Sequence, residues 1–431
     1  MENGVRPFGT EAFQVRGAAS PHSFRLENET VPPEQLIQAL TLVQRASKDL
    51  WPGFIPATIP TLVFDGDDTW LGGTTPATPG WEASLSGWRW RGRHPALVAN
   101  TAVTLPDGST AAGILLRSLG TVSAERLASL VIHEAFHVWQ AAHPSPAWEA
   151  NELDALTYPA GDAEVLHARA EETACLGAAL NKPDWQGDAA KALAWRAVRH
   201  GLLSARQREY EQRAETLEGL AQFVECQFLK ELPLLDPLAA VGLGIRPWAY
   251  FSGAASAFLL SRGGESWQAE VMSGTPLDSI LAGQIGTSDR MPEITPALAE
   301  AAAHAAQAHT LRLEHLRQQF DALPGKRLRL SGSKLRVVGF DPLNIHALPD
   351  GQLLHTRYVA VEVGDGRLEV LTAQALADGA DLLNPTALTV ADMTEPSVSG
   401  GRWQIRTVTL RADLPAANIS VTLNGWEASL D

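Results

Sequence analysis

The stretch Val131–Trp139 constrains this chain most, because it combines a helical pattern of apolar residues with the motif H-E-x-x-H. On a helix, His133 and His137 lie one turn apart on the same face, so both imidazoles can bind one zinc ion. Glu134 adjoins His133, where its carboxylate can take a proton from a metal-bound water. A favourable N-cap serine and a downstream Pro-Ser-Pro break predict that this helix spans about residues 123–142.

The composition excludes several classes of protein. The chain has 431 residues, of which 45% are hydrophobic and 19% are charged, as expected for a globular protein of two or three domains. The formal net charge of -15 argues against nucleic acid or an anionic membrane as the main partner. Two cysteines, Cys175 and Cys226, are too few for a disulfide-stapled secreted fold. Neither a signal segment nor an apolar run of about 18 residues is found, so a cytoplasmic location is expected.

The pattern along the chain predicts an α+β fold with three parts. Residues 1–120 are expected to be a mixed α/β N-terminal part of the catalytic region, with strands near 61–64, 97–104 and 111–116. Residues 121–325 are expected to be its helical, metal-binding part. Residues 326–431 carry short strand-like runs between turns and predict a separate all-β domain. Besides the motif helix, helical spacing is found near residues 32–50, 163–180, 188–203, 206–228, 248–260 and 296–323.

A catalytic zinc normally takes three protein ligands, so a third ligand is expected elsewhere in the chain. His143 follows the motif without the glycine turn of the longer H-E-x-x-H-x-x-G-x-x-H pattern and is not proposed. A carboxylate on a second helix is favoured instead. Either Glu171 or Glu172, or alternatively Glu218, is suitable, because Glu171 and Glu218 each have an alanine three residues later that lets the helix approach the metal closely. Spacing alone does not separate them.

The motif helix, the stretch Glu218-Gly219-Leu220-Ala221-x-Phe223 and the stretch Tyr250-Phe251-Ser252-Gly253 together resemble the gluzincin clan of metallopeptidases, in particular its zinc aminopeptidase branch. The resemblance covers about residues 95–260. It implies a gluzincin-like catalytic region, a small mixed sheet with a helical bundle, in which Glu218 is the third zinc ligand and Tyr250 donates a hydrogen bond to the tetrahedral intermediate.

The chain departs from this pattern in two respects. Glu218 lies 81 residues after His137, which is longer than the single helical hairpin usual in these families, and predicts a helical insertion over about residues 145–210. Glu171 or Glu172 therefore stays open as the alternative ligand. The strands before residue 120 also lack the G-x-M-E-N element of exopeptidases.

The sequence thus predicts a zinc-dependent hydrolase, most readily a peptidase, with Glu134 as general base and a peptide or peptide-like substrate. An edge strand at 97–104 is the candidate for pairing with the substrate backbone. Two alternatives are a non-catalytic zincin-like scaffold or binding protein and a zinc hydrolase of a non-peptide amide. These patterns do not indicate four further properties: the natural substrate, endo- or exopeptidase action, the role of the β domain and the oligomeric state.

Overall fold

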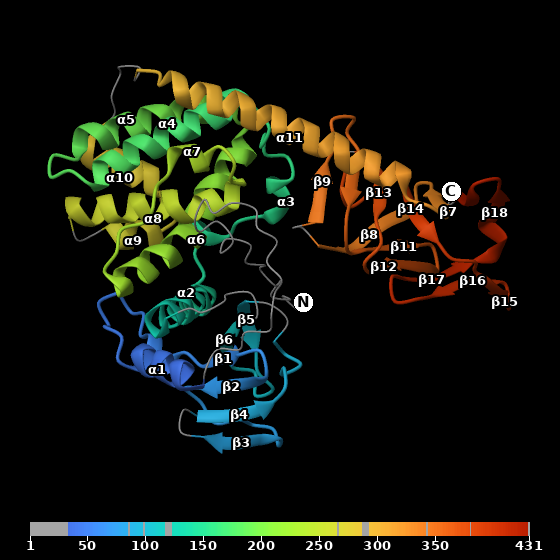
Figure 1. Cartoon of the computed structure of the whole chain (residues 1–431), viewed down its shortest axis with the longest axis horizontal. Helices are drawn as coiled ribbons and strands as arrows, with labels where there is room; N and C mark the ends of the chain where they lie inside the picture. The colour runs from blue at the N-terminus through green and yellow to red at the C-terminus, as the bar shows by residue number, and fades with distance from the viewer. Residues whose placement is uncertain are drawn as a thin grey trace. The chain divides into compact units, whose positions relative to one another are not determined.

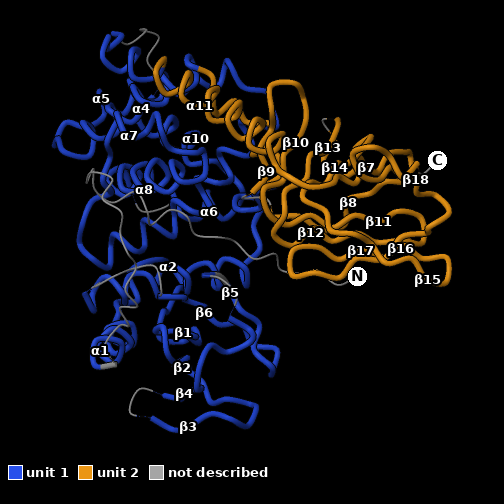
Figure 2. Tube along the Cα trace, turned by 45° about the vertical axis from the view of Figure 1, so that its right-hand side comes forward, with its two compact units in different colours: residues 1–151, 163–302 blue, residues 152–162, 303–431 orange. Residues whose placement is uncertain are grey.

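The computed structural model describes residues 33–84, 87–97, 100–116, 123–264, 267–286, 293–341, 344–379 and 381–429. They form a mixed α+β protein with three sheets and a strand-rich C-terminal region (Figure 1), which confirms the predicted class. The chain divides into two compact units, residues 1–151 with 163–302 and residues 152–162 with 303–431 (Figure 2). Residues 1–32 of the predicted N-terminal part lie outside the described residues.

The first unit contains a six-stranded sheet in the order β3-β4-β2-β1-β6-β5. Strands β1 and β6 run parallel, and the other neighbouring pairs are antiparallel. The buried side chains of β1 alternate between two clusters: Val63 packs with the helices of this unit, and Leu62 packs with Leu97 on the other face. The strands are β1 (Thr61–Phe64), β2 (Asp68–Gly72), β3 (Trp81–Ser84), β4 (Gly87–Arg91), β5 (Thr101–Thr104) and β6 (Thr110–Leu115).

The edge strand β5 is shorter than the predicted strand at 97–104. Leu97 lies in a turn, in which its N–H donates to the carbonyl of His94, so it does not belong to the strand. Residues 98 and 99 lie outside the described residues. The part of the prediction that forms a strand, Thr101–Thr104, pairs with β6 on one side and lies at the edge of the sheet.

The helical part of the first unit is built around α6, which packs against both α2 and α8. Helices α4 and α5 form a packed pair, and α4 also contacts α8, so these two helices of the segment predicted as an insertion are part of this bundle. No helix in the described residues is both long and apolar enough to cross a membrane. The helices are α1 (Pro33–Gln44), α2 (Ala124–Ala142), α4 (Ala163–Leu180), α5 (Gln186–Leu202), α6 (Ala205–Leu229), α7 (Pro237–Ala240), α8 (Ile245–Gly263), α9 (Trp267–Met272) and α10 (Leu277–Ile285).

The second unit is a two-sheet structure with one shared apolar core. Its seven-stranded sheet has the order β18-β19-β7-β14-β13-β10-β9, and its six-stranded sheet the order β15-β16-β17-β12-β11-β8. Buried and exposed residues alternate along β12 and β17, as expected for strands with one face on a core. The strands are β7 (Lys326–Ser331), β8 (Leu335–Phe340), β9 (Ile345–Ala347), β10 (Leu353–His355), β11 (Val359–Val363), β12 (Gly366–Val370), β13 (Ala375–Asp378), β14 (Ala387–Met393), β15 (Ser397–Ser399), β16 (Arg402–Arg406), β17 (Leu410–Pro415), β18 (Ile419–Thr422) and β19 (Gly425–Ser429).

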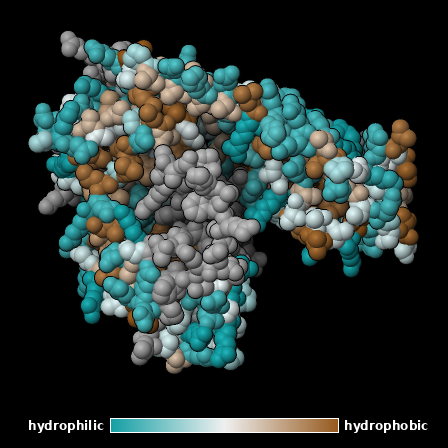
Figure 3. Space-filling view, viewed as in Figure 1, coloured by the Kyte–Doolittle hydropathy of each residue, from teal (hydrophilic) through white to brown (hydrophobic). Residues whose placement is uncertain are grey.

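The second unit also contains one short helix and most of a long one. Helix α11 (Pro296–Ala322) packs Leu313 and Phe320 against Leu354 and other residues of the seven-stranded sheet, and α3 (Glu152–Ala155) contributes Leu153 to the core between the sheets. The strands begin at residue 326, while the longer segment of the compact unit that contains them begins at residue 303, within α11. Figure 3 shows hydrophobic residues on the surface at the β18 end of this unit.

Candidate metal centre

Helix α2 carries the motif and is well defined by its sequence. The side chain of Ser123 caps its N-terminus by accepting a hydrogen bond from the N–H of Arg126, and Glu125 lies in the first turn, where a negative charge complements the helix dipole. Most of its residues are buried, because α2 lies between the sheet and α6. This packing buries His133 fully and leaves the side chain of His137 17% exposed.

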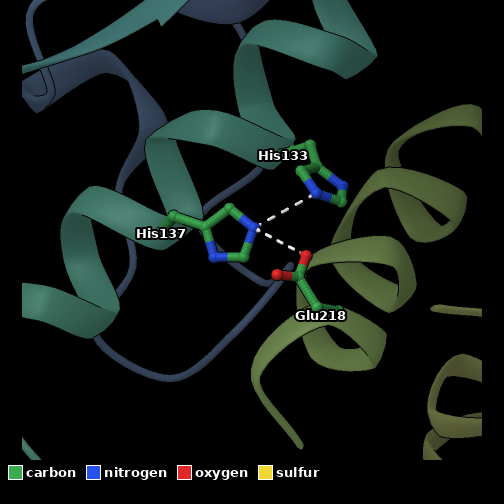
Figure 4. A group of neighbouring side chains, drawn as sticks. All are labelled: His133, His137 and Glu218. Carbon is green, nitrogen blue, oxygen red and sulfur yellow. Dashed lines mark hydrogen bonds and ion pairs between the residues drawn. The ribbon is translucent and has the colours of Figure 1, made fainter. Parts of the chain in front are cut away.

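The third group comes from α6, which packs directly against α2. Nε2 of His137 lies 3.2 Å from Nε2 of His133 and 3.4 Å from Oε2 of Glu218 (Figure 4). One potential ligand atom from each of these residues lies within 4.8 Å of the others. The structure therefore brings together the two motif histidines and Glu218, although 81 residues separate Glu218 from His137.

Two of the three separations in this group suit a tetrahedral zinc ion. Two nitrogen or oxygen ligands at the usual zinc distances, about 109° apart, are separated by roughly 3.3–3.4 Å. The two measured separations, 3.2 Å and 3.4 Å, are close to that value.

Neighbouring side chains orient both imidazoles so that Nε2 points into the site. Gln140 donates from Nε2 to the carbonyl of Leu217 at 3.1 Å, which turns its Oε1 toward Nδ1 of His137 at 2.8 Å. Nδ1 of His133 lies 3.3 Å from Oε2 of Glu225, whose other oxygen accepts from Ser129. Gln140 thus holds Nδ1 of His137, whereas Nδ1 of His133 faces Oε2 of Glu225 without a hydrogen bond of good geometry. In the tautomer that carries its proton on Nδ1, each imidazole would offer the lone pair of Nε2 to a cation.

The charge balance also favours a cation. Glu134, Glu218 and Glu225 are all buried, with 5%, 2% and 1% of their surfaces exposed. Arg246 contributes one positive charge, and its Nη2 donates to Oε1 of Glu218 at 2.5 Å. Because unpaired buried charges are costly, a cation beside Glu218 would add to the compensation that Arg246 gives its carboxylate.

The same surroundings shift the pKa values of the site. Burial raises the pKa of Glu134, and the two histidines offset this effect only in part. Burial would also raise the pKa of Glu218, but Arg246 and His137 outweigh it and hold that pKa far below the usual value for a carboxyl. Burial would lower the pKa of His137, yet Glu218 and Glu134 together raise it. The carboxylate of Glu218 therefore stays ionised.

Tyr250 of α8 completes the group. Its ring stacks on that of His133 with centroids 5.5 Å apart and planes 5° from parallel. Burial and the neighbouring carboxylate of Glu218 raise the pKa of Tyr250 well above its usual value. Tyr250 is thus a neutral phenol, able to donate its proton in a hydrogen bond.

The alternative ligands Glu171 and Glu172 lie apart from this group and have other partners. Glu171 accepts from the N–H of Thr295 at 2.5 Å and lies 3.2 Å from Nε2 of His167. Glu172 accepts from Arg196 at 2.8 Å and also from Arg199. Neither belongs to the group of potential ligands found among the described residues.

Sequence reasoning missed Gln140, Glu225 and the contact of Arg246 with Glu218. The spacing along the helices could have revealed the first two residues. Gln140 follows His137 by three residues and Glu225 follows Glu218 by seven, so each shares a helix face with a candidate ligand. For Arg246 no such periodicity is available, because it contacts Glu218 from another helix.

Comparison of the chain with protein-family models, curated proteins and solved structures finds no match.

Proposed function

We propose that this protein is a zinc-dependent hydrolase that cleaves peptide bonds. The observation that carries the proposal is the buried group of His133, His137 and Glu218, whose spacing and charge suit a tetrahedral zinc ion. Glu134 lies close enough to these three residues for their charges to act on its carboxyl.

Bound zinc supplies a Lewis acid and lowers the pKa of a water ligand to about 7. Glu134 acts as the general base: it takes a proton from the attacking water and passes it to the nitrogen of the leaving amine. The raised pKa of Glu134 brings it nearer to neutral pH, where a base of this kind is most effective.

Tyr250 acts on the carbonyl group of the scissile bond. Its neutral hydroxyl donates a hydrogen bond to the oxygen of the scissile carbonyl as negative charge develops there. The stacking of its ring on His133 keeps it beside the candidate ligands. Because a tyrosine anion could not donate, the raised pKa of Tyr250 preserves this role over the whole neutral range.

The substrate class that we propose is a peptide in extended conformation. Strand β5 is at the edge of its sheet, and its outward backbone groups have no neighbouring strand among the described residues. A strand edge of this kind can pair with the backbone of a peptide. β5 also packs against α2, the helix that carries the motif.

The test is hydrolysis of a peptide library by the purified protein. We expect cleavage that a chelator abolishes and that added zinc restores. Absence of cleavage in the zinc-loaded protein across the library would overturn the peptidase proposal. If zinc then binds in near-equal amount and chelation lowers the melting temperature, a non-catalytic zinc-binding scaffold is indicated. Cleavage of simple amides without cleavage of peptides would indicate a hydrolase of non-peptide amides.

A further inference from the structure

The two oxygens of Glu218 have different surroundings. Oε1 accepts a hydrogen bond from Nη2 of Arg246 at 2.5 Å. Oε2 makes no hydrogen bond of good geometry among the described residues and lies 3.4 Å from Nε2 of His137, and Tyr250 also acts on this carboxylate. One oxygen is thus held by a guanidinium, and the other faces the histidines.

We propose that Arg246 is a positioning residue that limits Glu218 to one-oxygen coordination of the metal. The inference rests on the proposed function only in that a metal ion binds to His133, His137 and Glu218. A carboxylate can bind a cation through one oxygen or both. Because Oε1 accepts a charge-assisted hydrogen bond from Arg246, turning Oε1 to a metal would cost that bond, so Oε2 is the favoured ligand atom.

The position of Arg246 in the fold suits this role. Arg246 lies in the first turn of α8, four residues before Tyr250, so both side chains are on one face of that helix. The side chain of Arg246 is 12% exposed, so it is fixed by the surrounding packing. Arginine is also always protonated in proteins, so this donor keeps its positive charge across the physiological pH range.

Limiting Glu218 to one oxygen matters for the geometry of the site. Two imidazole nitrogens and one oxygen would supply three ligands to a bound zinc ion, and a fourth position would stay open for water. If Oε1 were released, it could turn to the metal and raise the coordination number. Arg246 therefore keeps a position open without itself touching the metal.

Cobalt(II) tests this inference, because the intensity of its visible absorption falls when four-coordinate cobalt becomes five-coordinate. We compare the cobalt-loaded full-length protein with three variants: Arg246→Met, Arg246→Lys and Arg262→Met. Arg262 is the matched control, since it lies on the same helix but donates to backbone carbonyls at the end of α4. Arg246→Leu is a second neutral variant in case Arg246→Met does not fold.

The expected result is a strong band in the wild-type protein and in Arg262→Met, and a band several-fold weaker in Arg246→Met. Arg246→Lys keeps a charged donor and should restore the strong band. A wild-type band in the neutral Arg246 variants overturns the role of Arg246. Failure of the wild-type protein to bind cobalt or zinc overturns the metal centre itself, so the two failures are distinguishable.

Discussion

Gly219 of α6 and Gly253 of α8 lie in direct backbone contact: a Cβ atom on Gly219 would be 2.5 Å from the Cα of Gly253. Next to this contact, Glu215 of α6 binds Ser252 of α8 at 2.5 Å. Since α6 carries Glu218 and α8 carries Tyr250, the close approach of these helices sets the distance between those two side chains. Glycine is therefore suited to positions 219 and 253, because a side chain at either position would collide with the other helix.

Replacing Gly253 with alanine should force α6 and α8 apart. The new Cβ would lie 2.3 Å from the backbone oxygen of Glu215, which cannot move as a side chain can. We expect a loss of about 1–3 kcal/mol in the free energy of unfolding, together with weaker zinc binding. Thermal unfolding and zinc titration measure both effects. Gly201→Ala is the control: nothing lies within 4 Å of its Cβ position in exposed helix, so that variant should be slightly stabilised.

The third ligand is tested by comparing Glu218→Ala with Glu171→Ala. Loss of Glu218 should weaken zinc binding by more than the roughly 10–100-fold that loss of an outer-sphere partner typically costs. Glu171→Ala should lower the melting temperature, because Thr295 and His167 lose a buried partner, but it should retain zinc. Zinc content after gel filtration decides the question. The opposite pattern would make Glu171 the ligand.

Glu134→Gln should keep zinc and lose turnover. The amide has nearly the shape of the carboxylate but cannot accept the proton of water, and general base catalysis is typically worth about 10²–10⁴-fold in rate. The variant should therefore show unchanged zinc content and a kcat lower by about that factor. Turnover equal to that of the wild-type protein would remove Glu134 as the base.

Much of the fold could be predicted from local pattern. The helices α2, α4, α5, α6, α8 and α11 and the strand β1 were predictable to within a few residues, since each has the apolar period of its own element. The strand at 97–104 was predicted too long because its apolar first residue, Leu97, is buried in a turn. Burial alone does not distinguish a turn from a strand.

The residues of the candidate site could likewise be predicted only in part from local pattern. His133 and His137 could be paired from their spacing, because both lie on one helix. The choice between Glu218 and Glu171 depends on which helix packs against α2. The spacing of apolar residues along a helix does not show which other helix it packs against. Arg246 contacts Glu218 from a third helix, so only the tertiary arrangement reveals that contact.

Tyr250→Phe tests the proposed oxyanion donor. Removal of the hydroxyl leaves the ring stacked on His133, so the fold and zinc content should be preserved. We expect kcat to fall by about 10²–10³-fold, as for the loss of one oxyanion donor, with little change in KM. A kcat within a few-fold of the wild-type value would show that the hydroxyl does not act in the reaction.

His355 of β10 should make the stability of the protein depend on pH. Its ring is fully buried, and neither nitrogen has a hydrogen-bond partner among the described residues. Burial lowers the pKa of His355 from 6.5 to about 4 in the folded protein. Between these two values the unfolded chain binds a proton that the folded protein does not. The free energy of unfolding therefore falls as the pH drops from about 6.5 to about 4, by about 1.4 kcal/mol per pH unit at most.

His355→Leu should remove this dependence, because leucine is apolar, of similar size and cannot be protonated. The variant should match or exceed the wild-type stability at pH 8, since the imidazole that it replaces makes no hydrogen bond within the described residues, and should exceed it by about 2 kcal/mol at pH 5. Urea unfolding at both pH values measures the difference. His304→Leu, at an exposed position of α11, is the control and should follow the wild-type protein. Equal pH dependence in His355→Leu and wild type would mean that the imidazole of His355 is protonated, or reached by water, in the folded protein.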